Sequence, residues 1–135
     1  MSSWDDSLLI GVTLIDEQHQ ELVKRLDEFA DACNHGEGQI EVGQTLKFVV
    51  SYIKKHFKDE EELQALYAYP DMDAHKVLHA GFVANAIDLV QELKRSGPGA
   101  ELSAKVRKVL IKWFLMHIRV EDKKVSAHIH QTEGI

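Results

Sequence analysis

Residues 46–67 read LKFVVSYIKKHFKDEEELQALY, and both the fold and the chemistry of this chain can be approached from them. One series of side chains recurs there at every third or fourth position: Leu46, Val49, Ile53, His56, Glu60, Leu63 and Tyr67. Alternating steps of three and four are the spacing of one face of an α-helix that packs on other helices. The sequence therefore predicts a helix whose buried face includes an imidazole and a carboxylate.

Three other parts of the chain repeat this pattern of apolar side chains interrupted by histidine. The further stripes are His19, Leu22, Leu26, Phe29 and Cys33; Met72, His75, His79, Phe82, Ala86, Leu89 and Leu93; and Val106, Leu110, Trp113, His117 and Val120. No stretch alternates apolar and polar residues in the manner of a β-strand. Four amphipathic helices joined by short connections predict an all-α fold, an up-down-up-down four-helix bundle with an N-terminal arm.

The expected boundaries follow from the ends of the stripes and from glycine and proline. We expect a helix over about residues 16–35, ending near Gly36 and Gly38, and a second over about residues 40–68. The third should follow a cap at Asp71 or Asp73 and run to Arg95, and the fourth should begin near Glu101 or Ser103 and end around Lys124. Residues 1–15 lack a helical period and are predicted to form the arm, residues 16–124 the bundle, and residues 125–135 a loose tail. A chain of 135 residues suffices for one core and is too short for two, so residues 1–135 are expected to be one domain.

Composition excludes several classes of partner. The formal net charge of −6 disfavours nucleic acid and anionic membrane surfaces. The single cysteine, Cys33, allows no internal disulfide, and no apolar run approaches the length of a membrane span. The acidic start of the chain lacks the basic residues of a signal peptide. We therefore expect a cytoplasmic protein with no nucleic-acid or membrane partner, while the sequence leaves any protein partner unknown.

The ionisable members of the stripes are typical of a metal site. His56 with Glu60, and His75 with His79, are four residues apart and so project from one helix face. Unpaired imidazoles in a core are costly, and a metal ion bound between the helices converts that cost into binding energy. Five imidazoles with one or two carboxylates exceed the needs of one tetrahedral zinc ion. They suit two six-coordinate metals that share carboxylates, and the donor types are compatible with iron.

Each histidine taken alone can be explained without a metal ion. A lone buried histidine is usually hydrogen-bonded and structural, and His35, His128 and His130 are predicted to be solvated. The joint occurrence of five histidines in four apolar stripes favours the metal site. Spacing does not decide which carboxylate accompanies His117.

Glu121 is four residues from His117 and would share its face, whereas Asp122 would point roughly 140° away in a regular helix. Asp122 would need a bulge in the helix, or a geometry in which it reaches the metals from the side.

The ordered motifs of the chain resemble those of the hemerythrin family, most closely its single-domain bacterial members. The resemblance covers nearly the whole chain and places all seven family ligands in order. The motifs are Trp4, Gly11 and Ile15-Asp16-x-Gln18-His19; His56-Phe57-x-x-Glu60-Glu61; Tyr69-Pro70 followed by His75-x-x-x-His79; and Trp113-x-x-x-His117-Ile118-x-x-x-Asp122. One departure is Ala68, where relatives often have glycine before Tyr-Pro, and we expect it to alter only the turn.

The resemblance implies two non-heme iron ions joined by an oxo or hydroxo bridge. In that arrangement one iron is held by His75, His79 and His117, the other by His19 and His56, and both are bridged by Glu60 and Asp122. The resemblance thus selects Asp122 over Glu121. It also implies that Trp113, Phe114 and Ile118 wall a pocket for dioxygen.

The implied function is reversible binding of dioxygen for storage, delivery or scavenging, without enzymatic activity. The chain has no Glu-x-x-His pair of the kind that ferritin-like di-iron sites use twice, which argues against an oxygen-activating enzyme of that class. The alternatives are an oxygen or redox sensor that acts through a partner, and an enzyme that acts on nitric oxide or peroxide.

Overall fold

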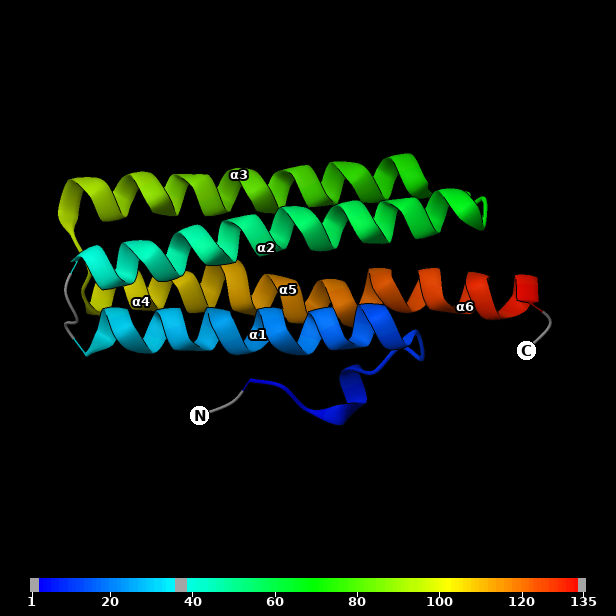
Figure 1. Cartoon of the computed structure of the whole chain (residues 1–135), viewed down its shortest axis with the longest axis horizontal. Helices are drawn as coiled ribbons and strands as arrows, with labels where there is room; N and C mark the ends of the chain where they lie inside the picture. Colours follow the sequence, from blue (N-terminus) through cyan, green and yellow to red (C-terminus); the bar gives the residue numbers. More distant parts are fainter. Residues whose placement is uncertain (1–2, 36–38, 134–135) are drawn as a thin grey trace.

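Four long helices form an antiparallel bundle in the computed structural model, which describes residues 3–35 and 39–133 (Figure 1). The first three are α1 (Thr13–Asn34), α2 (Gln39–Leu66) and α3 (Met72–Ser96), and a 3-10 turn, η1 (Asp6–Leu8), lies in the arm. The fourth is continuous through α4 (Ala100–Lys105), η2 (Val106–Ile111), α5 (Lys112–His117), η3 (Ile118–Asp122) and α6 (Lys123–Glu133). The predicted all-α four-helix bundle is confirmed, and the expected stop at Gly36 and Gly38 lies outside the described residues.

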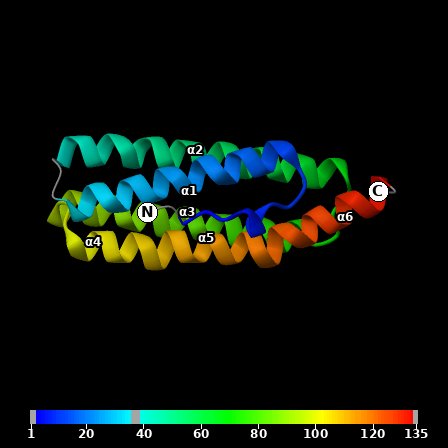
Figure 2. The same cartoon turned by 90° about the horizontal axis from the view of Figure 1, so that it is seen from below.

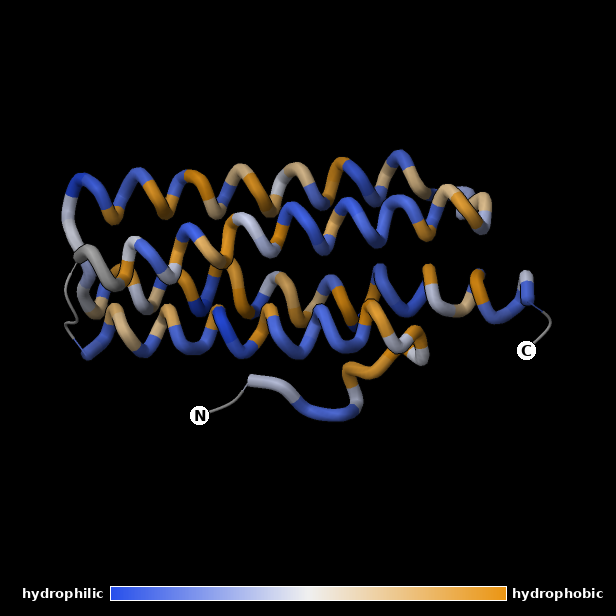
Figure 3. Tube along the Cα trace, in the orientation of Figure 1, coloured by the Kyte–Doolittle hydropathy of each residue, from blue (hydrophilic) through white to orange (hydrophobic). Residues whose placement is uncertain are grey.

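The apolar stripes meet along the axis of the bundle, as their spacing requires. The second helix packs on α1 and α3, while the fourth helix packs on both α1 and α3, which closes the bundle. Hydrophobic and hydrophilic segments alternate along every helix in Figure 3. Phe29, Phe82 and Phe114 are fully buried at the centre of the core. This apolar packing fixes the helices whose buried polar residues form the site described below.

The N-terminal arm runs back beneath the bundle, between α1 and the fourth helix (Figure 2). Leu8 is fully buried, and the carboxylate of Asp16 accepts the backbone N–H groups of Ile10 and Gly11 at 2.8 and 3.1 Å. Gly11 has a φ of 85°, and a Cβ built there would lie 2.9 Å from the His130 ring. Glycine is therefore required where the arm turns into α1.

The predicted loose tail is wrong over its described part, because α6 extends the fourth helix to Glu133, past the α2–α3 turn (Figure 1). Val125 and Ile129 are spaced i,i+4 and bury one helix face against Tyr69. His128 Nε2 donates to the Tyr67 carbonyl at 2.7 Å, so His128 is partly buried and bonded rather than simply solvated. His130 is likewise half-buried and bonded to the Gly11 carbonyl at 3.3 Å, and only His35, of the three histidines predicted to be solvated, is exposed.

The turn between α2 and α3 contains the departure from the family pattern. Ala68 has a φ of 51°, in the left-handed region that glycine adopts without a steric penalty. The N–H of the next residue, Tyr69, donates to the Gln64 carbonyl at 2.9 Å and closes the end of α2. The alanine therefore keeps the turn at some cost in backbone strain.

Candidate metal centre

The fourth helix is widened directly after His117, where spacing left Glu121 and Asp122 as alternative candidates. Residues Ile118–Asp122 form a π-helical segment, η3, directly after His117. A π-turn holds an extra residue, so a side chain at i+5 returns to the face that i+4 occupies in a regular helix. Asp122 consequently lies beside His117, with Oδ1 3.2 Å from His117 Nε2, while Glu121 is partly exposed and lies 3.7 Å from Lys124 Nζ. The bulge that an aspartate at this spacing requires is present.

The structure gathers the polar members of all four stripes into one buried cluster. We call His75, His79 and His117 the three-histidine group, and His19 and His56 the two-histidine group. Glu60 and Asp122 lie between them and belong to both: in each combined set the candidate ligand atoms lie within 4.8 Å of one another. All seven residues are buried. Together they form a single site with two adjoining halves.

Glu60 directs one carboxylate oxygen toward each group. Its Oε1 lies 2.8 Å from His75 Nε2 and 3.5 Å from His79 Nε2. Its Oε2 lies 3.2 Å from His56 Nε2 and 3.8 Å from His19 Nε2. This division of the two oxygens is what a carboxylate bridging two cations requires.

Asp122 divides its oxygens in the same way. Oδ1 lies 3.1 Å from His75 Nε2 and 3.2 Å from His117 Nε2, in the three-histidine group. Oδ2 lies 3.0 Å from His19 Nε2, in the two-histidine group. All five imidazoles therefore present Nε2 to the shared carboxylates, and the Nε2 atoms of His75 and His117 are only 3.0 Å apart.

Several polar atoms of the cluster lack hydrogen-bond partners, and a pair of metal ions would supply partners for them. The Nε2 atoms of His19, His56 and His79 have no hydrogen-bond partner, and neither do Glu60 Oε2 and both oxygens of Asp122. Buried polar atoms without partners are rare in native proteins because each costs desolvation energy. Coordinated cations between the two groups would satisfy these atoms, and imidazole with carboxylate is a donor set that suits iron.

The charges of the cluster support the same conclusion. Burial disfavours a charge on His19 and His75, but the adjacent carboxylates of Asp122 and Glu60 raise the pKa of both imidazoles to about 9. At His56 burial dominates and lowers the pKa. Burial and the nearby charge of Glu60 act against ionisation of Asp122, yet the adjacent imidazoles of His117, His19 and His75 hold its pKa at about 2. The imidazoles around Glu60 likewise hold its pKa well below the ordinary value, against the effect of burial. Without metal, the two carboxylates thus attract protons to the positions that cations would take.

Aromatic and aliphatic side chains enclose the cluster. The Phe114 ring lies edge-on to His19 and His56, with centroids 5.4 and 6.0 Å apart, and Ile118 is fully buried. Phe114 therefore borders the two-histidine group. Trp113 instead stacks on His117 at 4.8 Å, so the structure places this predicted pocket residue against the three-histidine group.

Three polar residues around the cluster have contacts that were not assigned from the sequence. Gln18 Oε1 lies 2.8 Å from His56 Nδ1, and Glu61 Oε2 lies 2.8 Å from His79 Nδ1. Gln64 is fully buried and donates to Glu60 Oε1 at 3.3 Å. Gln18 and Glu61 are chain neighbours of the candidate ligands His19 and Glu60 and belong to the motifs quoted above, and these are the sequence signals that could have pointed to them.

Comparisons with known proteins agree with this geometry. The sequence model of the hemerythrin HHE cation-binding domain matches residues 10–129. The chain is 33% identical to a bacteriohemerythrin of Stenotrophomonas maltophilia, over 95% of this chain and 84% of that protein. It is 32% identical to a myohemerythrin of Theromyzon tessulatum, over 93% of this chain and 92% of that one.

A solved structure of wild-type hemerythrin superposes with a TM-score of 0.81 at 23% identity, covering 96% of this chain and 98% of the other, and so shares the fold. Among the described residues no helix is long and apolar enough to cross a membrane. With the domain match spanning nearly the whole bundle and relatives above 30% identity along its length, this chain belongs to the hemerythrin family.

Proposed function

We propose that this protein is a non-heme di-iron protein that binds dioxygen reversibly and serves to store, deliver or scavenge it. The observation that carries the proposal is the division of Glu60 and Asp122, each of which offers one oxygen to each histidine group. His75, His79 and His117 would hold one iron, His19 and His56 the other, and the two carboxylates would bridge them beside an oxo or hydroxo group. When bound, the ferrous pair supplies the electrons and the coordination position that dioxygen requires.

The difference between the two groups suggests where dioxygen binds. The two-histidine group offers one imidazole fewer, so an iron held there would have room for a further ligand. Phe114 borders that group, and the buried Ile118 follows His117 on the same helix. These apolar side chains would keep water from the site, which slows irreversible oxidation.

The cluster contains no further group with an evident catalytic task. Its imidazoles present Nε2 to the shared carboxylates, and the polar residues next to them, Gln18, Glu61 and Gln64, are each hydrogen-bonded to a candidate ligand. We therefore propose a binding protein and not an enzyme.

Cycling the protein between oxygen and argon tests this proposal. Metal-free protein is loaded with ferrous iron under argon, exposed to oxygen, and returned to argon while its visible spectrum is recorded. We expect a band that appears with oxygen, disappears under argon, and survives repeated cycles. Stopped-flow mixing with nitric oxide and with peroxide forms the comparison. Catalytic consumption of either, without a reversible oxygen spectrum, would favour an enzyme and contradict the proposal.

A further inference from the structure

Two imidazoles of the cluster, those of His56 and His79, are hydrogen-bonded through Nδ1 to a side chain outside the cluster. His79 Nδ1 lies 2.8 Å from the Glu61 carboxylate, and His56 Nδ1 lies 2.8 Å from the Gln18 amide oxygen. Because both oxygens accept, each Nδ1 carries the proton and donates it in the hydrogen bond, which leaves the Nε2 lone pair free. That is the tautomer a metal ligand needs, because Nε2 is the atom that faces the shared carboxylates.

The helix itself explains why these partners sit next to ligands in the chain. Consecutive residues of an α-helix point about 100° apart. While Glu60 points to the centre of the bundle, Glu61 therefore points sideways, and its carboxylate reaches His79 on the neighbouring helix α3. Gln18 stands in the same relation to His19 and reaches across to α2.

The orientation of the His79 ring depends on Glu61 in a way that packing does not replace. Phe57 stacks on this ring at a centroid distance of 3.7 Å and an interplanar angle of 4°. Stacking fixes the plane of the ring, but it is nearly unchanged when the ring turns over and exchanges the edges that carry its nitrogens. The hydrogen bond to Glu61 distinguishes the two orientations and selects the one with Nε2 inward.

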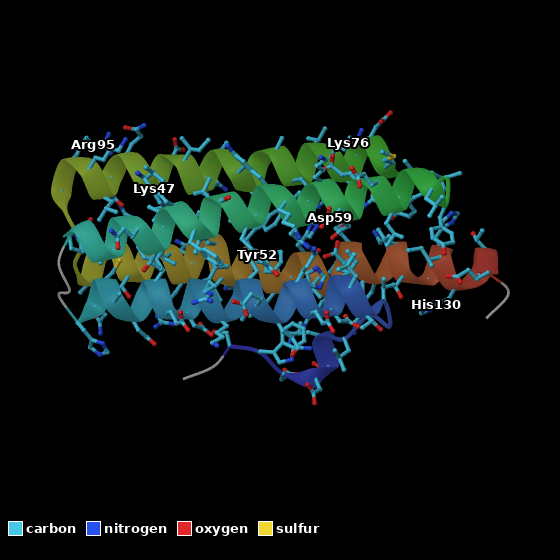
Figure 4. The ribbon with its side chains drawn as sticks, viewed as in Figure 1. Lys47, Tyr52, Asp59, Lys76, Arg95 and His130 are labelled. Atoms are coloured by element: carbon cyan, nitrogen blue, oxygen red, sulfur yellow. The ribbon has the colours of Figure 1, made fainter. Side chains whose placement is uncertain are left out.

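His56 has a neutral partner at the corresponding place. The Gln18 amide is itself oriented, because its Nε2 donates to Asp59 Oδ2 at 2.8 Å and so turns the carbonyl oxygen to His56. Asp59, labelled in Figure 4, lies on α2. A carboxylate acceptor makes an imidazole a stronger donor to a metal than an amide acceptor does. The two groups thus differ in the charge of these outer partners as well as in the number of imidazoles.

We propose that Glu61 is a positioning residue for the metal centre: it holds His79 in the Nε2-coordinating orientation and strengthens the three-histidine group as a metal ligand. This inference rests on the proposed di-iron function. Glu61 acts through His79, to which it is hydrogen-bonded. Its side chain is 26% exposed and borders a surface cavity of about 590 Å³, together with Glu62 and with Lys76, which Figure 4 labels on α3.

A zinc titration tests the proposal without reference to oxygen. Metal-free wild-type protein and the variants Glu61→Ala, Glu61→Gln and Glu62→Gln compete with a chelator for Zn²⁺. Glu62 is the matched control, because it is exposed, borders the same cavity and loses the same charge. We expect Glu61→Ala to weaken one of two binding steps by about 10- to 100-fold, the usual effect of removing such a partner. Glu61→Gln should lose less, since an amide oxygen already serves His56, and Glu62→Gln should match the wild type.

Histidine ¹⁵N–¹H NMR of the zinc-loaded proteins supplies a second measurement. We expect a protected Nδ1–H on His79 in the wild type and in Glu61→Gln, and its loss in Glu61→Ala. The proposal is overturned if Glu61→Ala binds zinc as Glu62→Gln does, or if wild-type His79 carries its proton on Nε2. Should Glu61→Ala fail to fold, the Glu61→Gln titration and the wild-type spectrum decide. A wild type that takes up two irons and cycles with oxygen while these tests fail would refute only the role of Glu61.

Discussion

Replacing Asp122 by asparagine removes one negative charge from the centre of the bundle and keeps the volume of the side chain. Asp122 is fully buried and approaches imidazoles of both histidine groups, at 3.0 Å for His19 and 3.1 Å for His75. In the metal-loaded protein the Asp122 carboxylate would be the buried anionic partner of the cations, and removing one partner of a buried ion pair costs about 3–5 kcal/mol. Because about 1.4 kcal/mol is a factor of ten in affinity, iron binding should weaken by roughly two to three and a half orders of magnitude.

Glu121→Gln is the matched control for this variant. It removes the same charge one residue away, from a side chain that is 30% exposed and 3.7 Å from Lys124. An ion pair at the surface contributes about 0–1 kcal/mol, so iron binding should change little. The assay is anaerobic titration of each metal-free protein with ferrous iron against a chelator, with circular dichroism as the check on folding. The argument is refuted if Asp122→Asn keeps its iron affinity within tenfold of the wild type, or if Glu121→Gln loses it.

Three further outcomes follow from the structure. Ile118→Val should shorten the lifetime of the oxygen-bound protein, measured as the rate of spontaneous oxidation in air, at a stability cost of only about 0.5–1.5 kcal/mol; an unchanged oxidation rate would remove Ile118 from the pocket. His19 and His75, whose pKa values are about 9, are protonated near pH 7 in the metal-free protein, so metal uptake at that pH should release about two protons. The metal affinity should therefore fall about a hundredfold for each unit by which the pH drops below 7. Calorimetry in buffers of different ionisation enthalpy counts the released protons. Ala68→Gly should raise the unfolding free energy by up to about 1 kcal/mol, because relief of the left-handed strain exceeds the added entropy of glycine in the unfolded chain, and a fall in the denaturant midpoint would contradict this.

The pH dependence of folding has a defined sign for the same two imidazoles. Their pKa in the folded, metal-free protein is raised above the ordinary value of 6.5 to about 9. The stability that they contribute is therefore fully present below about pH 6.5 and is lost as the pH rises through 9.

The bundle could be predicted because its stripes are long and regular. The series from Leu46 to Tyr67 has one period along a whole helix, and only a buried helix face explains it. The polar members of the stripes could be named for the same reason, since His56, Glu60, His75 and His79 fall in register with core residues that the structure buries.

Asp122 shows where local spacing stops being informative. In a regular helix it would point away from His117, and only the π-helical segment Ile118–Asp122 brings it to the cluster. Residue spacing does not reveal such a segment, so the family resemblance selected a residue that regular helical geometry did not.

The extension of the fourth helix through α6, predicted as a loose tail, was missed because its buried face is short and its partners are distant in the chain. Val125 and Ile129 alone carry the apolar period, and they pack against Tyr69, more than fifty residues away. The roles of Gln18 and Glu61 were inaccessible for a similar reason. Each depends on which neighbouring helix lies beside it, and the sequence of one helix does not contain that information.

The iron content of the saturated protein tests the di-iron assignment most directly. Metal-free protein is saturated with ferrous iron under argon, freed of loosely bound metal on a desalting column, and analysed for iron and protein. Two histidine groups joined by Glu60 and Asp122 predict two irons per chain. A saturating value near one iron per chain would contradict the di-iron centre and, with it, the proposed binding of dioxygen.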